Sequence, residues 1–347
     1  MRHLVTGGCG FIGSNYILKQ INKNKNIVLN IDKLTYAGNL ENLSSITNDP
    51  HYSFLNGDIC DIKFVTKTIE DFKPDYIIHF AAESHVDRSI DSPIDFVNTN
   101  ILGTANLLNA SLNYWVQIQN TFKFIHISTD EVFGSLGSSG YFTEKTPYDP
   151  SSPYSSSKAA SDHLVRAWNR TYGLPTLITN CSNNYGPFQF PEKLIPLMIA
   201  NCLDEKSLPI YGKGENIRDW LFVDDHCTAI DAVISNGIIG ETYNIGGNNE
   251  IKNLDIVNII CSIMDELKPR KNNQSYKNLI QYVADRPGHD FRYAIDSSKI
   301  KKELSWAPKQ TFESGIRKTV IWYLENENWW REIQKINYKQ ERLGLKS

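Results

Sequence analysis

The chain has 347 residues, of which 41% are hydrophobic and 22% charged, with a formal net charge of -3 at pH 7. This length can bury one large core or two joined cores, and the composition is that of a soluble globular enzyme. The basic residues are scattered, which argues against a nucleic-acid partner. No apolar run is long enough to span a bilayer, and Met1 leads into a core strand instead of a signal peptide.

The six cysteines and eight histidines show no metal-ligand spacing, so we expect no metal site. The cysteines also form no C-x-x-C pair, which is typical of reduced thiols used in packing. We therefore expect a cytoplasmic protein.

The first predicted element is a strand at residues 3–6, followed by Gly7, Gly10 and Gly13 and then by a helical pattern over residues 14–22. Glycines between a strand and a helix permit a tight turn and close approach of the backbone to a ligand. The G-x-x-G-x-x-G spacing is a variant of the dinucleotide fingerprint. It predicts a pyrophosphate at the helix N-terminus.

The second predicted strand, residues 27–31, runs into Asp32. An acid about 20 residues after the glycines hydrogen-bonds the adenosine ribose and repels a 2′-phosphate. We therefore expect NAD in preference to NADP, although Lys33 could meet a phosphate. The alternative interpretation of Asp32 is a turn residue at a strand end.

Further strands alternate with helical patterns along the first half of the chain. They are expected at residues 53–55, 76–80, 124–127 and 176–179. This alternation predicts an α/β fold with a doubly wound parallel sheet of Rossmann type. We assign residues 1–180 to an NAD-binding domain. Residues 181–347, where prolines interrupt the pattern, form a smaller substrate-binding region, with some chain returning to the main domain.

Two motifs carry the predicted chemistry. Tyr154 and Lys158 lie four residues apart in a helical pattern over residues 154–172, so they share one face. This pair is typical of hydride transfer to or from a nicotinamide. Upstream, Asp130 and Glu131 add an acid and a base, which a plain dehydrogenase or epimerase does not evidently need. The alternative for the two carboxyls is a cap at a strand end.

With these features and its length, the sequence resembles the extended short-chain dehydrogenases/reductases that act on nucleotide sugars. Within that group, ordered segments across nearly the whole chain resemble the dTDP-glucose 4,6-dehydratases. The segments are 84–89, 128–132, 182–187, 190–196, 218–220 and 286–290. Phe133, Gln189 and a short segment between Glu131 and Tyr154, which is Gly- and Ser-rich at 134–140, depart from the family pattern. Gln189 and the short segment concern the detail of substrate contacts.

The resemblance implies a reaction in three parts. NAD oxidises the sugar at C4, and water is lost across C5 and C6. The hydride then returns to C6 while C5 is reprotonated, so the tightly bound cofactor is regenerated. Tyr154, as a phenolate favoured by the Lys158 cation, takes the 4-hydroxyl proton, and Thr129 orients the 4-oxygen. Glu131 removes the C5 proton, and Asp130, held neutral beside a second carboxyl, protonates the leaving 6-hydroxyl.

The glycine turn, the strand ends and the resemblance together give a set of expected cofactor contacts. These are Gly7, Gly10, Phe11, Ile12, Gly13, Asp32, Lys33, Leu34, Thr35, Asp58, Ile59, Phe80, Ala81, Ala82, Ser84, Thr99, Tyr154, Lys158 and Asn184. For Asp58, Ala81 and Ala82 the alternatives are a turn acid and ordinary packing.

The resemblance also implies a set of substrate contacts. These are Ser84, His85, Thr129, Asn183, Lys193, Leu194, Pro209, Tyr211, Arg218, Asn253, Arg286 and His289. Arg218 and Arg286 would grip the pyrophosphate, because a guanidinium matches paired oxygens. The alternatives are a local ion pair for Arg218 and a turn residue for Arg286.

The implied substrate is dTDP-glucose, and the product, dTDP-4-keto-6-deoxyglucose, would feed rhamnose-type deoxysugars of surface polysaccharides. UDP-glucose stays open, since an apolar pocket discriminates a methyl group only weakly. A nucleotide-sugar 4-epimerase or decarboxylase and a non-catalytic NAD-binding regulator are further alternatives. The family also implies a homodimer, with helices near 98–112 and 154–172 forming a four-helix bundle with their copies.

Overall fold

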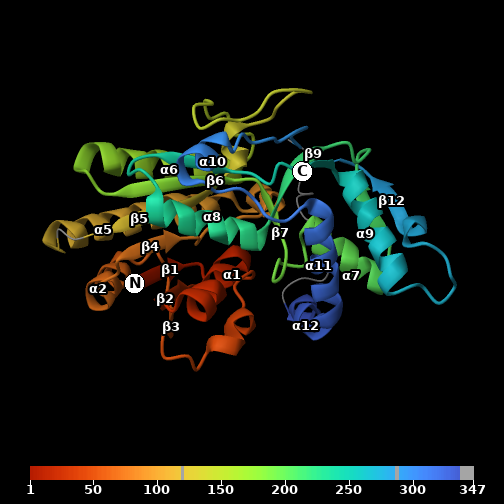
Figure 1. Ribbon diagram of the computed structural model, residues 1–347, viewed down its shortest axis with the longest axis horizontal. Helices are drawn as coiled ribbons and strands as arrows, with labels where there is room; N and C mark the ends of the chain where they lie inside the picture. The colour runs from red at the N-terminus through yellow and green to blue at the C-terminus, as the bar shows by residue number, and fades with distance from the viewer. Residues whose placement is uncertain (119–120, 286–288, 337–347) are drawn as a thin grey trace.

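The computed structural model describes residues 1–118, 121–285 and 289–336. Its centre is a seven-stranded parallel sheet in the order β10-β6-β5-β4-β1-β2-β3 (Figure 1). The strands are β1 (Arg2–Thr6), β2 (Ile27–Asp32), β3 (Tyr52–Asn56), β4 (Tyr76–His79), β5 (Lys123–Thr129), β6 (Thr176–Cys181) and β10 (Thr242–Ile245). All six strands predicted from the sequence are present, and the doubly wound α/β fold is confirmed.

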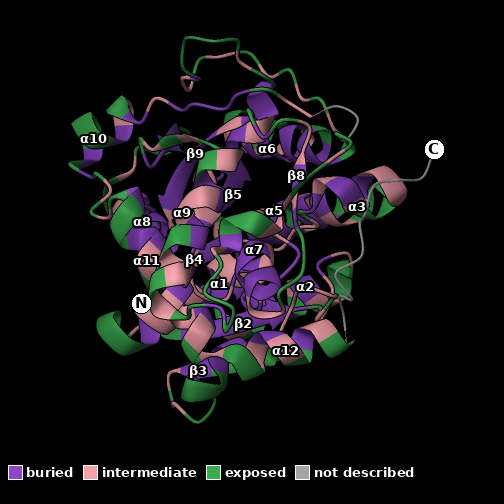
Figure 2. Cartoon of the chain, turned by 90° about the vertical axis from the view of Figure 1, so that its right-hand side faces the viewer, coloured by how far each residue is buried: buried purple, intermediate pink, exposed green. Residues whose placement is uncertain are grey.

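Helices cover both faces of this sheet because the strands are apolar on both sides. One buried cluster joins the sheet to α1 (Phe11–Lys19) and α8 (Val223–Asn236). A second joins the opposite face to α2 (Ile62–Phe72), α5 (Thr104–Ile118) and α6 (Pro153–Tyr172). Figure 2 shows buried strands between helices whose outer surfaces are exposed. The short elements at this level are η1 (Gln20–Asn24), η2 (Leu40–Ile46), α3 (Val86–Asp91), α4 (Pro93–Phe96), η3 (Val97–Gly103), η4 (Asp130–Phe133) and α10 (Ser298–Leu304).

A smaller lobe lies at one end of the sheet, on the right of Figure 1. It contains a three-stranded sheet in the order β11-β9-β7 and a two-stranded sheet of β12 and β8. The elements are β7 (Asn183–Tyr185), α7 (Leu194–Leu203), β8 (Leu208–Tyr211), β9 (Ile217–Phe222), β11 (Glu250–Lys252), α9 (Asn253–Leu267), η5 (Tyr276–Leu279), β12 (Ile280–Val283), α11 (Phe312–Glu325) and α12 (Glu327–Ile336). The lobe has an apolar core of its own, built largely from α7, α9 and α11.

The chain crosses between the two parts more than once. After β9 it returns to the sheet as α8 and β10, and β10 pairs with β6 along the register from Thr242 to Ile245. It returns again as α10, which packs on β10 and α8. The domain boundary after residue 180 stays a prediction.

The start of α6 shows how local sequence sets the position of Tyr154 and Lys158. Ser152 and Ser155 form a capping box, and Pro153 occupies the first turn, where its missing N–H costs nothing. Gly173 then ends the helix with φ 76°. The helix that these signals delimit packs on β5 and β6.

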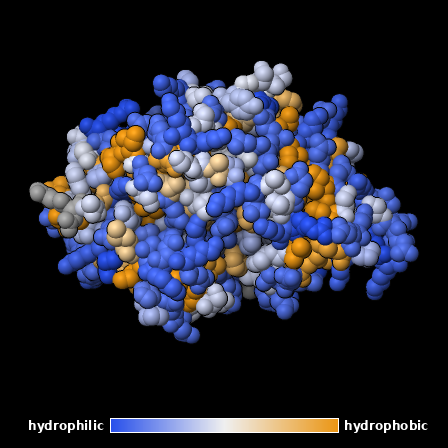
Figure 3. All heavy atoms as spheres, viewed as in Figure 1, coloured by the Kyte–Doolittle hydropathy of each residue, from blue (hydrophilic) through white to orange (hydrophobic). Residues whose placement is uncertain are grey.

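The surface is mainly hydrophilic, with separate hydrophobic patches on the face seen in Figure 3. Among the described residues, none of the helices has both the length and the apolar character required to cross a bilayer.

Candidate active site

The glycine turn lies between β1 and α1, against the end of β4. Gly7 has φ +73°, and a Cβ at this position would lie 2.6 Å from the backbone of Ala81. A Cβ on Gly13 would lie 2.4 Å from the carbonyl oxygen of Gly7. Only glycine fits both positions, so the turn is as tight as the sequence predicts.

Asp32 ends β2 beside this turn, with its carboxylate held by the backbone. Its oxygens accept hydrogen bonds from the N–H groups of Cys9, at 2.9 Å, and Leu34, at 2.8 Å. Burial raises the pKa of Asp32, and these two bonds oppose the rise. The neighbouring Lys33 pairs with Asp58 at 2.7 Å. Lys33, which could have bound the 2′-phosphate of NADP, therefore already has a carboxylate partner.

A single cleft at the carboxyl ends of the strands brings most of the predicted residues together. Its lining includes Gly7, Gly10, Phe11, Ile12, Gly13, Asp32, Lys33, Thr35, Asp58, Ile59, Phe80, Ala81, Ala82, Ser84, Thr99, Thr129, Asp130, Glu131, Tyr154, Lys158, Asn183, Asn184 and Lys193. Of the expected cofactor contacts, Leu34 alone is outside this lining, and its φ of +56° belongs to the turn after Asp32. Ligands of doubly wound folds bind at this edge of the sheet.

The predicted acid and base follow the central strand β5. Thr129 is its last residue, and Asp130 and Glu131 begin η4. Thr129 caps that short helix, because its Oγ1 accepts the N–H of Glu131 at 3.3 Å. The strand end therefore does serve as a cap, but through the threonine, which leaves both carboxyls in the lining of the cleft.

Asp130 is almost fully buried, with 1% of its surface exposed. Its Oδ1 accepts a 3.4 Å hydrogen bond from Thr129 Oγ1, and its Oδ2 has no hydrogen-bond partner. Burial, the Glu131 carboxylate and the Asp219 carboxylate raise its pKa well above the ordinary value. These surroundings favour the neutral, protonated form of Asp130.

Tyr154 and Lys158 reach the same cleft from α6. Burial raises the pKa of Tyr154 well above its ordinary value, and the Glu131 carboxylate adds to the effect. Burial lowers the pKa of Lys158 to about 8. In the protein alone, burial therefore outweighs the phenolate-stabilising effect that the sequence predicts for Lys158, and a phenolate needs more positive charge nearby.

Some predicted substrate residues bridge the two parts of the molecule. Lys193 Nζ donates to the carbonyl oxygen of Ser84 at 3.4 Å, and both residues line the cleft. Asn183 also lines it, at the start of β7. His85 and Leu194 lie just behind, with the His85 ring 3.8 Å from the Glu192 carboxylate and Leu194 at the start of α7.

Other predicted substrate residues lie in the smaller lobe and outside the lining of the cleft. These are Pro209, Tyr211, Arg218, Asn253 and His289. Arg218 donates to the carbonyl oxygens of Ile217 and Asp290 at 2.8 and 2.9 Å, and its guanidinium lies 4.2 Å from the centre of the Tyr293 ring. His289 pairs with Asp285 at 2.6 Å. Arg286 lies outside the described residues.

The structure adds lining residues that sequence reasoning missed. They are Ile31, Tyr36, Ala37, Gly38, Gly57, Glu83, Ile127, Ser128, Cys181, Ser182, Gln189, Phe190 and Glu192. A compact cluster joins three stretches of the chain that are far apart in sequence. The Arg88 guanidinium lies 3.7 Å from the centre of the Tyr36 ring and donates to the Glu192 carboxylate at 3.1 Å. Arg88 and Glu192 belong to segments that carry the family resemblance, which was the available signal.

Comparisons with known proteins identify the family of this chain. A family profile described as GDP-mannose 4,6 dehydratase matches residues 4–319. The dTDP-glucose 4,6-dehydratase of Neisseria meningitidis serogroup B is 56% identical, over 98% of each chain. The chain belongs to the dTDP-glucose 4,6-dehydratase family. The Escherichia coli enzyme of the same name is 55% identical, over 99% of each chain.

Solved structures agree with the sequence relatives. A dTDP-glucose 4,6-dehydratase from Streptomyces venezuelae with NAD and dTDP bound has a TM-score of 0.88 and 44% identity, covering 96% of this chain and 100% of its own. A UDP-glucose 4-epimerase from Thermotoga maritima has a TM-score of 0.84 with only 28% identity, covering 94% and 100%. The fold is therefore shared with epimerases, whereas the higher sequence identity is with the dehydratases.

Proposed function

We propose that the protein converts dTDP-glucose into dTDP-4-keto-6-deoxyglucose and water, with a tightly held NAD that is regenerated in each turnover. The observation that carries this proposal is the neutral, buried Asp130 next to Glu131 in the cleft that also holds Tyr154 and Lys158. An elimination needs an acid and a base together, whereas a 4-epimerase needs neither at this position. The identity to dehydratases supports the same choice.

The residues of the cleft fit NAD. Gly7 and Gly13 leave no room for a side chain, so the backbone can approach a pyrophosphate at the start of α1. Asp32 places a carboxylate where a ribose diol is expected, and its neighbour Lys33 is paired with Asp58. When bound, NAD accepts a hydride from C4 and returns it to C6 of the sugar. Gly10, Phe11, Ile12, Thr35, Ile59, Phe80, Ala81, Ala82, Ser84, Thr99, Lys158 and Asn184 complete the proposed cofactor contacts.

Tyr154 is the proposed base for the oxidation step. It takes the proton from the sugar 4-hydroxyl, while Thr129 hydrogen-bonds the 4-oxygen. Because burial raises the pKa of Tyr154, the charge of Lys158 and of the oxidised nicotinamide must favour the phenolate together. The pKa of Lys158, about 8, lies near the working pH, so the charge of this lysine can respond to the titration of Tyr154.

Elimination then uses the two adjacent carboxyls. The 4-ketone makes the C5 proton acidic, and Glu131 removes that proton. Asp130, which is neutral, gives its proton to the departing 6-hydroxyl, so that water leaves. The two carboxyls divide the roles because Asp130 is buried deeply enough to stay protonated while its neighbour carries the charge.

The proposed substrate residues divide into two groups. Ser84, Thr129, Asn183 and Lys193 contact the sugar or nucleotide from the cleft itself, with His85 and Leu194 directly behind. Pro209, Tyr211, Arg218, Asn253 and His289 act from the smaller lobe, and Arg286 is proposed as a further contact. Arg218 would exchange a carbonyl partner for a phosphate oxygen.

We also propose a cytoplasmic homodimer in which the η3–α5 segment and α6 form a four-helix bundle with their copies. Hydrophobic side chains on and before this helical segment support the proposal: Ile94, Val97, Leu102 and Val116 are 65%, 44%, 49% and 57% exposed. Light scattering at micromolar concentration tests it, and a mass of one chain would disprove it. The product of the reaction would supply rhamnose-type deoxysugar synthesis.

The experiment that tests the activity is mass spectrometry of the protein incubated in deuterated water with dTDP-glucose and, separately, UDP-glucose. Loss of one water with uptake of one solvent deuteron at C5 is the expected result. The faster nucleotide names the substrate, and we expect dTDP-glucose. Conversion of glucose to galactose at unchanged mass would instead establish an epimerase and refute the roles given to Asp130 and Glu131.

A further inference from the structure

Four side chains on α6 follow one another at intervals of four residues: Tyr154, Lys158, Asp162 and Arg166. This spacing places successive side chains side by side along one helix face. The proposed function uses the first two. Asp162 is fully buried one turn further on and lies outside the lining of the cleft. A carboxylate is retained at such a depth only where other groups pair with it or hydrogen-bond it.

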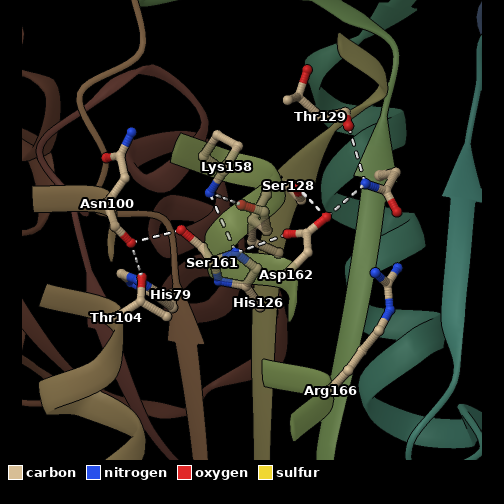
Figure 4. A network of polar contacts seen from close by, with 12 residues as sticks. His79, Asn100, Thr104, His126, Ser128, Thr129, Lys158, Ser161, Asp162 and Arg166 are labelled. Atoms are coloured by element: carbon tan, nitrogen blue, oxygen red, sulfur yellow. Dashed lines mark hydrogen bonds and ion pairs between the residues drawn. The ribbon is translucent and has the colours of Figure 1, made fainter. Parts of the chain in front are cut away.

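Asp162 is surrounded by donors from several parts of the fold (Figure 4). Its Oδ2 accepts hydrogen bonds from Tyr148 at 2.7 Å, Ser128 at 3.0 Å and Asn180 at 3.2 Å. The Nε2 atom of His126 lies 3.2 Å from Oδ1. Burial raises the pKa of Asp162, but the His126 ring and the other partners outweigh it, and the pKa is lowered. Asp162 is therefore a buried anion.

Lys158 approaches the same nitrogen of the His126 ring. Its Nζ is 3.5 Å from His126 Nε2 and donates to the carbonyl oxygen of Ile127 at 2.9 Å. Burial lowers the pKa of Lys158, and the Asp162 carboxylate is the largest influence that opposes this. Because burial also lowers the pKa of His126 to about 4, that ring is neutral. In one tautomer its Nε2 can accept a hydrogen bond from Lys158, and in the other its Nε2–H can donate to Asp162. The tautomer of the ring therefore links the lysine to the aspartate.

The same carboxylate also holds β5, the strand that immediately precedes the proposed acid and base. Ser128, which bonds Asp162, immediately precedes Thr129 on β5. Asn180 on β6 donates both to Asp162 and to the carbonyl oxygen of Thr129, the latter at 3.0 Å. One side chain thus connects the helix that carries Tyr154 to the end of the strand that carries Thr129.

We propose that Asp162 is a positioning residue for the dehydratase reaction, acting as the buried counter-ion of Lys158 and holding the end of β5 against α6. The inference rests on the proposed function, because it concerns the same site. It goes beyond that function by assigning a role to a residue that does not line the cleft.

Among the titratable groups around Lys158, Asp162 is the anion that most raises the pKa of the lysine. On the protein side they are His79 on β4, His126 on β5, Cys181 on β6, Tyr148 in the loop before α6 and Arg166 on α6. Burial lowers the pKa of His79 and raises that of Cys181 to about 12, so both are neutral. Arg166 donates to the Tyr148 hydroxyl at 2.6 Å. On the cleft side lie Asp130, Glu131 and Tyr154.

The test is the pH profile of dTDP-glucose dehydration by Asp162→Asn. Loss of the anion lets Lys158 lose its proton at lower pH, so the alkaline limb of kcat moves down by about one pH unit. The rate at pH 8 falls about fivefold, because the protonated fraction of Lys158 falls from about one half to about one tenth. KM changes by less than about twofold, because Asp162 does not line the cleft. A limb that stays in place would overturn the proposal.

Two control variants separate charge from structure. Asp162→Glu keeps the charge, and we expect its alkaline limb to stay near that of the parent; a limb shifted as far as in Asp162→Asn would refute the counter-ion role. Asp225→Asn changes another buried helical aspartate, which accepts the N–H of Gln310 at 2.8 Å. Its pH profile should match the parent.

A further variant decides the matter if Asp162→Asn does not fold. Tyr148→Phe keeps the carboxylate and removes its shortest hydrogen bond, and we expect kcat to fall by about threefold or more. An unchanged kcat would overturn the proposal. If the parent protein itself does not dehydrate dTDP-glucose, the proposed function fails. If the parent does so and both Asp162→Asn and Tyr148→Phe behave like it, only the role of Asp162 fails.

Discussion

Replacement of Asp130 by asparagine tests both the protonation state and the role of this residue. The substitution keeps the shape and removes the exchangeable proton. Since burial and two neighbouring carboxylates raise the pKa of Asp130 in the folded protein, the native state binds a proton that the unfolded chain releases above pH ~3.9. That proton uptake stabilises the native state at low pH, and the benefit declines as the pH rises towards the folded pKa.

The magnitude follows from linkage. Between the unfolded and folded pKa of Asp130, parent stability falls by about 1.4 kcal/mol for each pH unit through this group, whereas the asparagine variant has no such loss. The free energy of unfolding of the variant, relative to that of the parent, should therefore rise by about that amount from pH 5 to pH 6. Denaturant unfolding of the cofactor-free proteins measures it. A constant difference across this range would show that Asp130 is ionised in the native state.

The same variant should slow dehydration by a factor of about 10²–10⁴, the usual contribution of a general acid. The oxidation step should survive, because Tyr154 and Lys158 are unchanged. Rapid mixing with dTDP-glucose should therefore show reduced nicotinamide accumulating before water is lost. Dehydration at the parent rate would refute the assignment of Asp130 as the acid.

Three other substitutions test the remaining parts of the site. Glu131→Gln should allow the cofactor to be reduced but block loss of water, seen as absorbance of reduced nicotinamide without product; normal dehydration would remove Glu131 as the base. Tyr154→Phe should slow even the first hydride transfer by about 10²–10⁴, and a normal transient would assign that proton to another group. Gly7→Ala should destabilise the protein by about 1–2 kcal/mol and lower its NAD content, since φ is +73° and the new Cβ would lie 2.6 Å from the Ala81 backbone; unfolding and bound-NAD measurements that match the parent would show that the turn can relax.

The parts of the fold and site that could be predicted from sequence are those encoded by neighbouring residues. Alternating apolar segments predicted six strands of the sheet, and the glycine spacing predicted the turn before α1. Tyr154 and Lys158 were paired because an α-helix places residues four apart on one face. Asp32 was found by its distance from the glycines. Each of these patterns is contained within a few tens of residues, where chain geometry alone relates the positions.

Tertiary structure decided the features that depend on distant segments. The seventh strand, β10, joins the sheet beside β6 although residues 182–241 lie between the two in the sequence. Arg88 meets Glu192 across 104 positions of sequence. The present contacts of Arg218, with backbone carbonyls and Tyr293, also follow from the fold of the smaller lobe. No local periodicity encodes such meetings.

The charged groups of the site likewise depend partly on local sequence and partly on tertiary structure. The sequence identified Asp130 and Glu131 as a possible acid and base, because two adjacent carboxyls repel each other as anions. Their different burial separates the roles, and burial is a property of the assembled fold. Asp162 could be seen in the sequence as the residue four after Lys158. Its role as a buried anion depends on donors from β5, β6 and the loop before α6, which only the packed structure brings to one carboxylate.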